Sequence, residues 1–80
     1  MTGEFTMPKL GHLMEEGTVM GWRKREGERF TKGEVLLEVE SEKAILEVEA
    51  LHDGVLLEIL VKAGQTVPVG APLAIVRRDE

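Results

Sequence analysis

VLLEVESEKAILEVEA, residues 35–50, consists of two alternating apolar and acidic segments on either side of a short polar turn. Alternation with a period of two is typical of a β-hairpin that buries one face. Folding the segment about Glu42 and Lys43 brings apolar residues opposite one another on that face. The expected pairs are Val39 with Leu46, Leu37 with Val48, and Val35 with Ala50. Lys43 is then at the solvent-exposed tip.

The tip lacks the residues that two-residue hairpin loops usually recruit. Primed turns need positive φ and favour Asn-Gly or Gly-X, so Glu42-Lys43 predicts a type I turn instead. In the same register Glu38 faces Glu47, a like-charge pair that opposes stability. We interpret this pair as a recognition feature. A lone surface lysine usually has no special role, and the rest of the chain decides whether this one does.

An internal repeat places the hairpin at a special point of the chain. Shifting the sequence by 37 residues aligns turn glycines with turn glycines and apolar residues with apolar residues. The aligned pairs are Gly17 with Gly54, Gly27 with Gly64, Gly33 with Gly70, Trp22 with Ile59, Phe30 with Val67, and Leu36 with Leu73. The chain is therefore two similar halves, with Lys43 at their junction. A quasi-two-fold molecule would have this hairpin at one end and both termini toward the other.

Length and composition limit the class of protein. Eighty residues predict one domain, 1–80, with a core at about 4–78, a loose leader at 1–3 and the start of a polar linker at 77–80. The absence of cysteine excludes a disulfide scaffold and fits an intracellular protein. A net charge of −5 argues against a nucleic-acid surface. No apolar run is long enough to span a membrane, and the N-terminal residues have neither the apolar core of a signal peptide nor an Arg-rich transit pattern.

Short apolar runs with glycine and proline between them predict strands throughout. We expect strands near 4–9, 16–24, 34–41, 43–50, 54–61 and 72–78, with shorter pieces around Phe30 and Val67. This pattern predicts an all-β sandwich or flattened barrel. At Asp53-Gly54 we expect a turn that needs the conformational freedom of glycine.

No complete active site is recognisable. His12 and His52 are too far apart for a metal motif, and the alternating glutamates predict a solvated strand face. A catalytic lysine needs burial or a neighbouring cation, and neither is expected at this exposed tip, which makes Lys43 a poor nucleophile or base. A protruding amine is nevertheless a good substrate for a separate modifying enzyme.

Several short motifs occur together in this chain. In combination they closely resemble the lipoyl domain of the acyltransferase (E2) component of 2-oxo acid dehydrogenase complexes, over roughly residues 5–76. The resemblance implies a flattened barrel, or sandwich, of two four-stranded antiparallel sheets with quasi-two-fold symmetry. The motifs are Met7-Pro8-Lys9-Leu10-Gly11, Glu15-Glu16-Gly17-Thr18-Val19, Trp22, Glu26-Gly27, Lys32-Gly33-Glu34, Glu40-Ser41-Glu42-Lys43-Ala44, Glu47-Val48-Glu49-Ala50, Asp53-Gly54 and Val67-Pro68-Val69-Gly70.

The resemblance also implies a site. Lys43 would carry lipoic acid in amide linkage, and the family's usual aspartate before the lysine is replaced here by the longer Glu42, which bears on partner preference. Leu13 and Met14 also have an ordinary core interpretation. The residues implied in recognition are Glu40, Ser41, Glu42 and Ala44 around the lysine, and Gly11, His12, Leu13, Met14 and Glu15 in a neighbouring loop that helps E1 to recognise the domain.

By the same resemblance the domain is a non-catalytic carrier. Its arm would accept an acyl group from a thiamine-diphosphate E1, deliver it to the E2 catalytic core for transfer to coenzyme A, and be reoxidised by the flavoenzyme E3. A lipoate-attaching enzyme would modify it, and the parent protein would be a dihydrolipoamide acyltransferase. The isolated domain is expected to be monomeric, and to be cytoplasmic in a bacterium or archaeon or in the mitochondrial matrix of a eukaryote.

Three alternatives stay open. A biotinyl carrier domain shares the fold, but usually has methionines on both sides of its lysine, where this chain has Glu42 and Ala44. A glycine-cleavage H protein also carries lipoate, but is normally longer and has added helices. An unmodified structural or adaptor barrel would need no exposed hairpin lysine.

Overall fold

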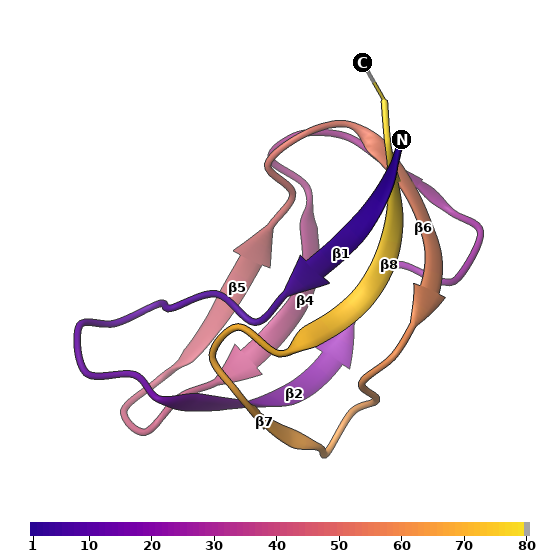
Figure 1. The fold of residues 1–80 in the computed structure, drawn as a ribbon. Coiled ribbons are helices and arrows are strands. Elements are labelled where there is room, and N and C mark those ends of the chain that lie inside the picture. Colours follow the sequence, from indigo (N-terminus) through magenta and orange to yellow (C-terminus); the bar gives the residue numbers. More distant parts are fainter. Residues whose placement is uncertain (80) are drawn as a thin grey trace.

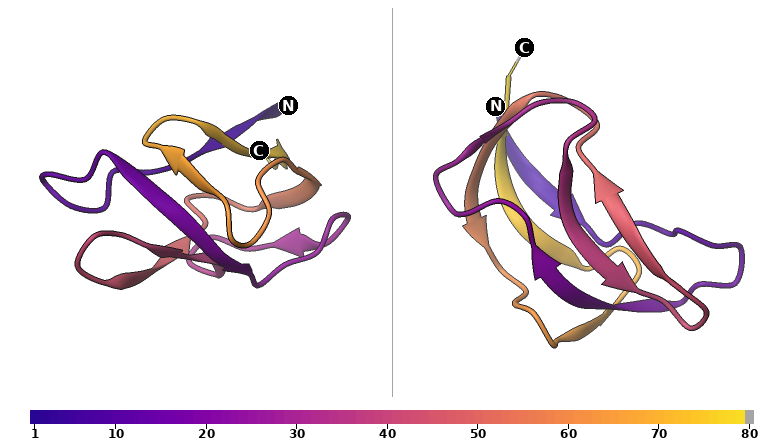
Figure 2. Two further views of the ribbon diagram at one scale, coloured as in Figure 1. Left: turned by 90° about the horizontal axis from the view of Figure 1, so that it is seen from below. Right: turned by 180° about the vertical axis from the view of Figure 1, so that it is seen from behind.

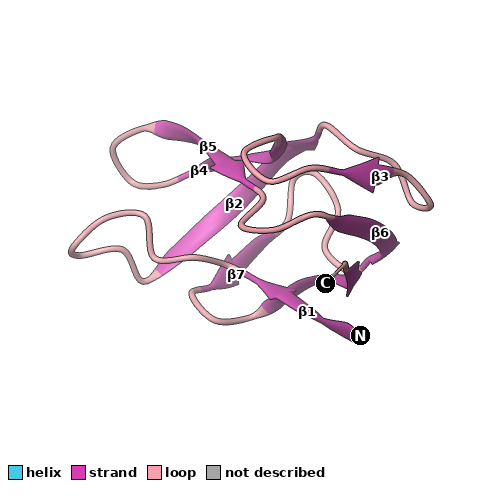
Figure 3. Cartoon of the chain, turned by 90° about the horizontal axis from the view of Figure 1, so that it is seen from above, coloured by secondary structure: helices cyan, strands magenta, loops and turns pink. Residues whose placement is uncertain are grey.

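Eight short strands make up the chain in the computed structural model, which describes residues 1–79 (Figure 1). They form two four-stranded antiparallel sheets, ordered β1-β8-β6-β3 and β5-β4-β2-β7, with no helix among the described residues (Figure 3). The predicted all-β sandwich of two four-stranded sheets is therefore confirmed. The strands are β1 (Thr2–Thr6), β2 (Glu16–Trp22), β3 (Arg29–Phe30), β4 (Val35–Glu40), β5 (Ile45–Glu49), β6 (Gly54–Ile59), β7 (Thr66–Pro68) and β8 (Pro72–Arg78).

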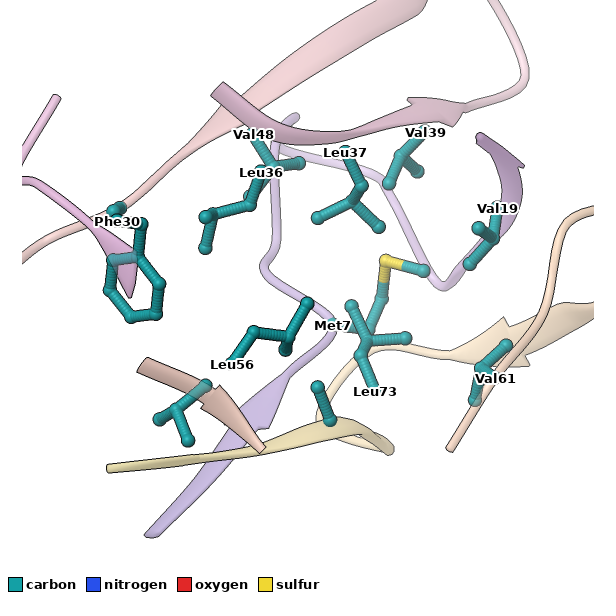
Figure 4. Close-up of a cluster of buried hydrophobic side chains, with 13 residues drawn as sticks. Met7, Val19, Phe30, Leu36, Leu37, Val39, Val48, Leu56, Val61 and Leu73 are labelled. Atoms are coloured by element: carbon teal, nitrogen blue, oxygen red, sulfur yellow. The ribbon is translucent and has the colours of Figure 1, made fainter. Parts of the chain in front are cut away.

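The core lies between the two sheets, where the inward residues of each strand meet (Figure 4). Within residues 1–79 no polar or charged side chain is buried, so the core is held by apolar packing alone. No helix long and apolar enough to cross a membrane occurs in this part of the chain. The buried residues are Met7, Val19, Phe30, Leu36, Leu37, Val39, Val48, Ala50, Leu56, Val61, Leu73, Ala74 and Val76.

The internal repeat is confirmed as a structural two-fold that relates β2, β3, β4 and β5 to β6, β7, β8 and β1. Corresponding hydrogen bonds recur: Gly27 N–H donates to the Leu56 carbonyl at 2.6 Å, and Gly64 N–H donates to the Val19 carbonyl at 2.7 Å. The four turn glycines, at positions 27, 33, 64 and 70, have φ between 92° and 94°. Both halves thus use the same left-handed turns, which only glycine adopts without strain.

The chain ends differ from the prediction. The first strand is Thr2–Thr6 rather than 4–9, and the expected leader is wrong because Thr2 pairs with Arg77. Arg78 N–H donates to the Met1 carbonyl at 2.7 Å, so the proposed linker start at 77–78 is also strand. An edge strand needs only backbone bonds on one side, and polar residues such as Thr2 and Gly3 satisfy that without an apolar pattern. Glu80, the last residue of the expected linker, lies outside the described residues.

The two termini leave the sandwich side by side, at the end opposite the β4–β5 hairpin (Figures 1 and 2). This matches the placement expected from the repeat, because the hairpin tip and the chain ends occupy equivalent positions of the two halves.

Candidate functional site: a lysine hairpin beside an extended loop

The β4–β5 hairpin has the predicted register near its tip. Val39 is opposite Leu46, Leu37 is opposite Val48, and Glu38 is opposite Glu47. Further from the tip the prediction is wrong, because Val35 pairs with Glu49 rather than Ala50. A bulge at Leu36 causes this shift, and it lets two consecutive residues, Leu36 and Leu37, both enter the core.

The tip is short and held by its own bonds. Ser41 N–H donates to the Ala44 carbonyl at 2.8 Å, and the Ser41 hydroxyl donates to the same oxygen at 3.1 Å. No described residue other than glycine has a positive φ, which excludes a primed turn at Glu42-Lys43 and fits the expected type I turn. The tip is thus a small closed turn, and Glu42 and Lys43 are its outermost residues.

Lys43 is presented to solvent at the end of this hairpin. Within residues 1–79 its ammonium group takes part in no hydrogen bond or ion pair, whereas other cations such as Arg23 and Lys24 are paired. The hairpin that carries it packs Val39 and Val48 into the core. Lys9, Lys32 and Lys62 are also exposed and unpaired within residues 1–79, so what distinguishes Lys43 is its place at the tip of a hairpin that is packed onto the core.

A loop from the β1–β2 connection lies beside the tip (Figure 1). Leu13 is 80% exposed, so its core interpretation is wrong, whereas Met14 is half-buried and packs against the core. Two adjoining surface grooves bring the predicted site residues together, although their roles in recognition stay predictions. One groove is lined by Leu10, Gly11, His12, Leu13, Met14, Ser41, Glu42, Lys43, Ala44 and Leu46, and the other includes Glu15, Glu16 and Glu40.

Arg23 lies near the hairpin, a position that no sequence motif predicts. Its guanidinium lies 2.9 Å from a Glu38 oxygen and 3.6 Å from a Glu47 oxygen. A cation therefore bridges the facing glutamates and offsets their repulsion. A role in recognition is no longer needed to explain why this like-charge pair is present. The basic run at 23–25 was the available signal, but only the pairing of β2 with β4 shows which carboxylates it reaches.

A second ion pair lies away from the tip, between Lys24 and Glu34, with Nζ and Oε2 2.8 Å apart. The side-chain hydrogen bond between them raises the pKa of Lys24 and lowers the pKa of Glu34. The described residues contain no cluster of three metal-ligating side chains, and His52 instead packs against Phe30 with ring centroids 5.8 Å apart.

Comparisons with known proteins identify the family of this chain. A family model described as "Biotin-requiring enzyme" matches residues 3–76. The chain is 46% identical over 76 residues to the mitochondrial pyruvate dehydrogenase complex protein X component of Chaetomium thermophilum, covering 94% of this chain and 17% of that protein. It is 44% identical over 77 residues to a chloroplastic dihydrolipoyllysine-residue acetyltransferase component of the pyruvate dehydrogenase complex of Arabidopsis thaliana. That match covers 96% of this chain and 16% of that protein.

A third relative is the pyruvate dehydrogenase E1 component subunit beta of Rhizobium meliloti, 41% identical over 80 residues, which cover 99% of this chain and 17% of that protein. This chain therefore spans less than a fifth of the length of each of these three proteins.

Among solved structures, the lipoyl domain of the 2-oxoglutarate dehydrogenase complex of Azotobacter vinelandii superposes with a TM-score of 0.78 at 31% identity. The match covers 96% of this chain and 98% of that domain, so the likeness extends over the whole fold. It confirms the resemblance that the motifs indicated. The two-sheet sandwich, the hairpin lysine and these matches together show that the chain belongs to the family of biotinyl and lipoyl carrier domains.

Proposed function

We propose that this domain carries lipoic acid in amide linkage on Lys43 and moves acyl groups between the enzymes of a 2-oxo acid dehydrogenase complex. The observation that carries the proposal is the exposed Lys43 amine, without a partner among residues 1–79, at the end of the sandwich opposite the termini. An accessible amine that no other group holds fits amide attachment. When bound, the group supplies a dithiolane that can be reduced and acylated.

The residues of this chain contribute position and reach. The Ser41–Ala44 hydrogen bonds hold the tip, and the buried valines of β4 and β5 keep the hairpin fixed to the sandwich. Amide formation removes the positive charge of Lys43, which makes entry into a partner's active-site channel less costly. Because the termini leave from the far end, a tether there would leave the tip free, and tethering raises the concentration at each active site.

The partners in this proposal are a thiamine-diphosphate E1, the E2 catalytic core, the flavoenzyme E3 and a lipoate-attaching enzyme. The names of the relatives support such a complex, since all three are pyruvate dehydrogenase components. We propose a dihydrolipoamide acyltransferase as the parent protein. Domains of this type also occur in proteins named protein X and E1 subunit beta, so the assay below tests the domain rather than its parent.

Relatives with mitochondrial, chloroplastic and bacterial sources fit work in the cytoplasm of a bacterium or in an organelle of a eukaryote. The alternative cargo is biotin, because the matching family model includes biotin-dependent proteins. Glu42 and Ala44 flank the lysine in place of the methionines that a biotinyl domain would usually have, and this favours lipoate.

Intact-mass analysis tests the cargo. The domain is incubated with ATP, lipoate and a lipoate-protein ligase, and in parallel with ATP, biotin and a biotin ligase. We expect one lipoyl increment, mapped by peptide analysis to Lys43, and no biotin. Lys43→Arg should fold normally and gain nothing, whereas the matched change Lys32→Arg, in another exposed turn, should still be modified. Biotin in place of lipoate, or no modification at all, would reject the proposal in favour of a biotinyl or an unmodified barrel.

A further inference from the structure

The connection before β2 is the place where the two halves of the molecule differ most in length. Gly70 N–H donates to the Met7 carbonyl at 2.9 Å, and Gly33 N–H donates to the Ala50 carbonyl at 2.8 Å, so Met7 and Ala50 are equivalent. From Met7 to Gly17 there are nine intervening residues, whereas from Ala50 to Gly54 there are three. The longer connection is the one beside Lys43. We call residues 8–15 the extension.

The extension has few internal bonds, and they converge on one side chain. The two hydrogen bonds found within residues 8–14 both involve Met14: Leu10 N–H donates to Met14 Sδ at 3.2 Å, and Met14 N–H donates to the Gly11 carbonyl at 3.1 Å. After this segment, Val69 N–H donates to the Glu15 carbonyl at 2.9 Å and fixes the start of β2. Met14 is therefore the residue that closes the extension on itself.

The same side chain also fastens the extension to the sandwich. Met14 packs against the hydrophobic core, and its Cε lies 2.9 Å from the point where a Cβ on Gly17 would stand. The same point lies 2.7 Å from Val39 Cγ1, so the glycine leaves room for both side chains. An unbranched thioether suits both tasks, because it fills an irregular gap and its sulfur is a weak acceptor.

Anchoring at Met14 leaves its neighbour pointing outward. Leu13 is 80% exposed and lines the groove that also contains Lys43. Met14 lines this groove and the acidic one next to it, and it shares that position with Leu13, Ser41 and Glu42.

We propose that Met14 is a positioning residue, which clips the extension to the sandwich and so sets where Leu13 stands relative to Lys43. The enzymes that modify and load Lys43 would then read a surface whose shape depends on this thioether. The second part rests on the proposed function, whereas the clip itself does not.

Two substitutions separate the roles of Met14. Met14→Leu keeps an apolar side chain of similar size but has no acceptor for Leu10 N–H, and Met14→Ala removes the packing as well. Met20→Leu is the matched control, since Met20 is 43% exposed on β2 and lines neither groove. Far-UV circular dichroism and thermal unfolding first establish that each variant is folded.

Amide hydrogen exchange measures whether Met14 holds the extension, and enzyme kinetics measure whether that hold affects recognition. Exchange of the Leu10 amide should rise about threefold in Met14→Leu, the low end of the scale for one lost hydrogen bond because sulfur is a weak acceptor, and further in Met14→Ala. For lipoate attachment, KM for the domain should rise several-fold with kcat unchanged, because positioning affects recognition rather than chemistry. Met20→Leu should change neither quantity.

Unchanged Leu10 exchange in folded Met14→Ala would overturn the clip. Faster exchange with unchanged KM would overturn the link between the clip and recognition. Failure of the proposed function looks different, because the unmodified wild-type domain would then show the protected Leu10 amide but accept no lipoate.

Discussion

Replacing Gly54 with alanine should destabilise the domain strongly, for a reason that the structure makes specific. Gly54 begins β6 opposite Arg78, and a Cβ there would overlap the Arg77 carbonyl oxygen and lie 3.0 Å from Phe30 Cζ. The first obstacle is backbone of the neighbouring strand, and the second is a fully buried ring. Neither can move without disturbing the β6–β8 pairing or the core.

The magnitude follows from these obstacles. Overpacking costs about 1–3 kcal/mol in well-packed cores, and a backbone obstacle places Gly54→Ala near about 3 kcal/mol. For a domain of this size the melting temperature should fall by about 12–24 °C. Urea unfolding followed by Trp22 fluorescence and circular dichroism measures the free-energy change, since Trp22 packs against the core and its Nε1–H donates to the Val61 carbonyl at 2.9 Å.

Gly21→Ala is the matched control for this prediction. Gly21 also lies in a strand without a positive φ, but a Cβ there meets nothing within 4 Å. Its free energy of unfolding should stay within about 0.5 kcal/mol of the wild type. Equal destabilisation by Gly21→Ala and Gly54→Ala, or a Gly54→Ala variant as stable as the wild type, would refute the steric reasoning.

Three other perturbations have expected outcomes. Arg23→Ala leaves the facing glutamates of β4 and β5 unbridged and should lower the free energy of unfolding by about 0.5–1 kcal/mol at low salt. The loss should shrink in 0.5 M salt, where the Debye length is roughly 4 Å, and a salt-independent loss would contradict the bridge. The ion pair with Lys24 lowers the pKa of Glu34, so the stability that the pair contributes is present above the ordinary pKa of 4.5 and is lost as pH falls through the lowered value. Glu34→Gln should therefore lower the free energy of unfolding at pH 7 but hardly at about pH 2, as measured by urea unfolding. An equal effect at both pH values would argue against the pair. Gly64→Ala forces a side chain to adopt φ of 94° and should cost about 1–2 kcal/mol in thermal or urea unfolding, with no loss meaning that the turn relaxes.

Gly54 is a required glycine, as the sequence predicts, but for a different physical reason. The glycine was expected to supply an unusual turn conformation, yet its φ is not positive. Its role is close approach of two strands, and the partner is Arg77, far along the chain. By contrast, Gly27 and Gly64, which the repeat aligns as turn glycines, do adopt the left-handed conformation.

The same distinction holds at the candidate site. The hairpin register near Lys43 could be predicted because both strands are adjacent in sequence and their alternation fixes which residues face inward. The bulge at Leu36 could not, since it depends on how much room the opposite sheet leaves for a second leucine. The exposure of Leu13 could not be predicted either, because an apolar residue in a loop belongs to no periodic pattern that shows whether it faces the core or the solvent.

The features that can be predicted from the sequence are local or repeated: strands with a period of two, turns at spaced glycines, two equivalent halves and a lysine at a hairpin tip. Contacts between distant groups are visible only in the folded molecule: Arg23 with the facing glutamates, Met14 with the space left by Gly17, and Gly54 with the backbone of β8. The two kinds of feature differ in the sequence separation of the residues on which they depend. Alternation and turn preferences depend on neighbouring residues, whereas these contacts depend on which strands pair and how the two sheets stack.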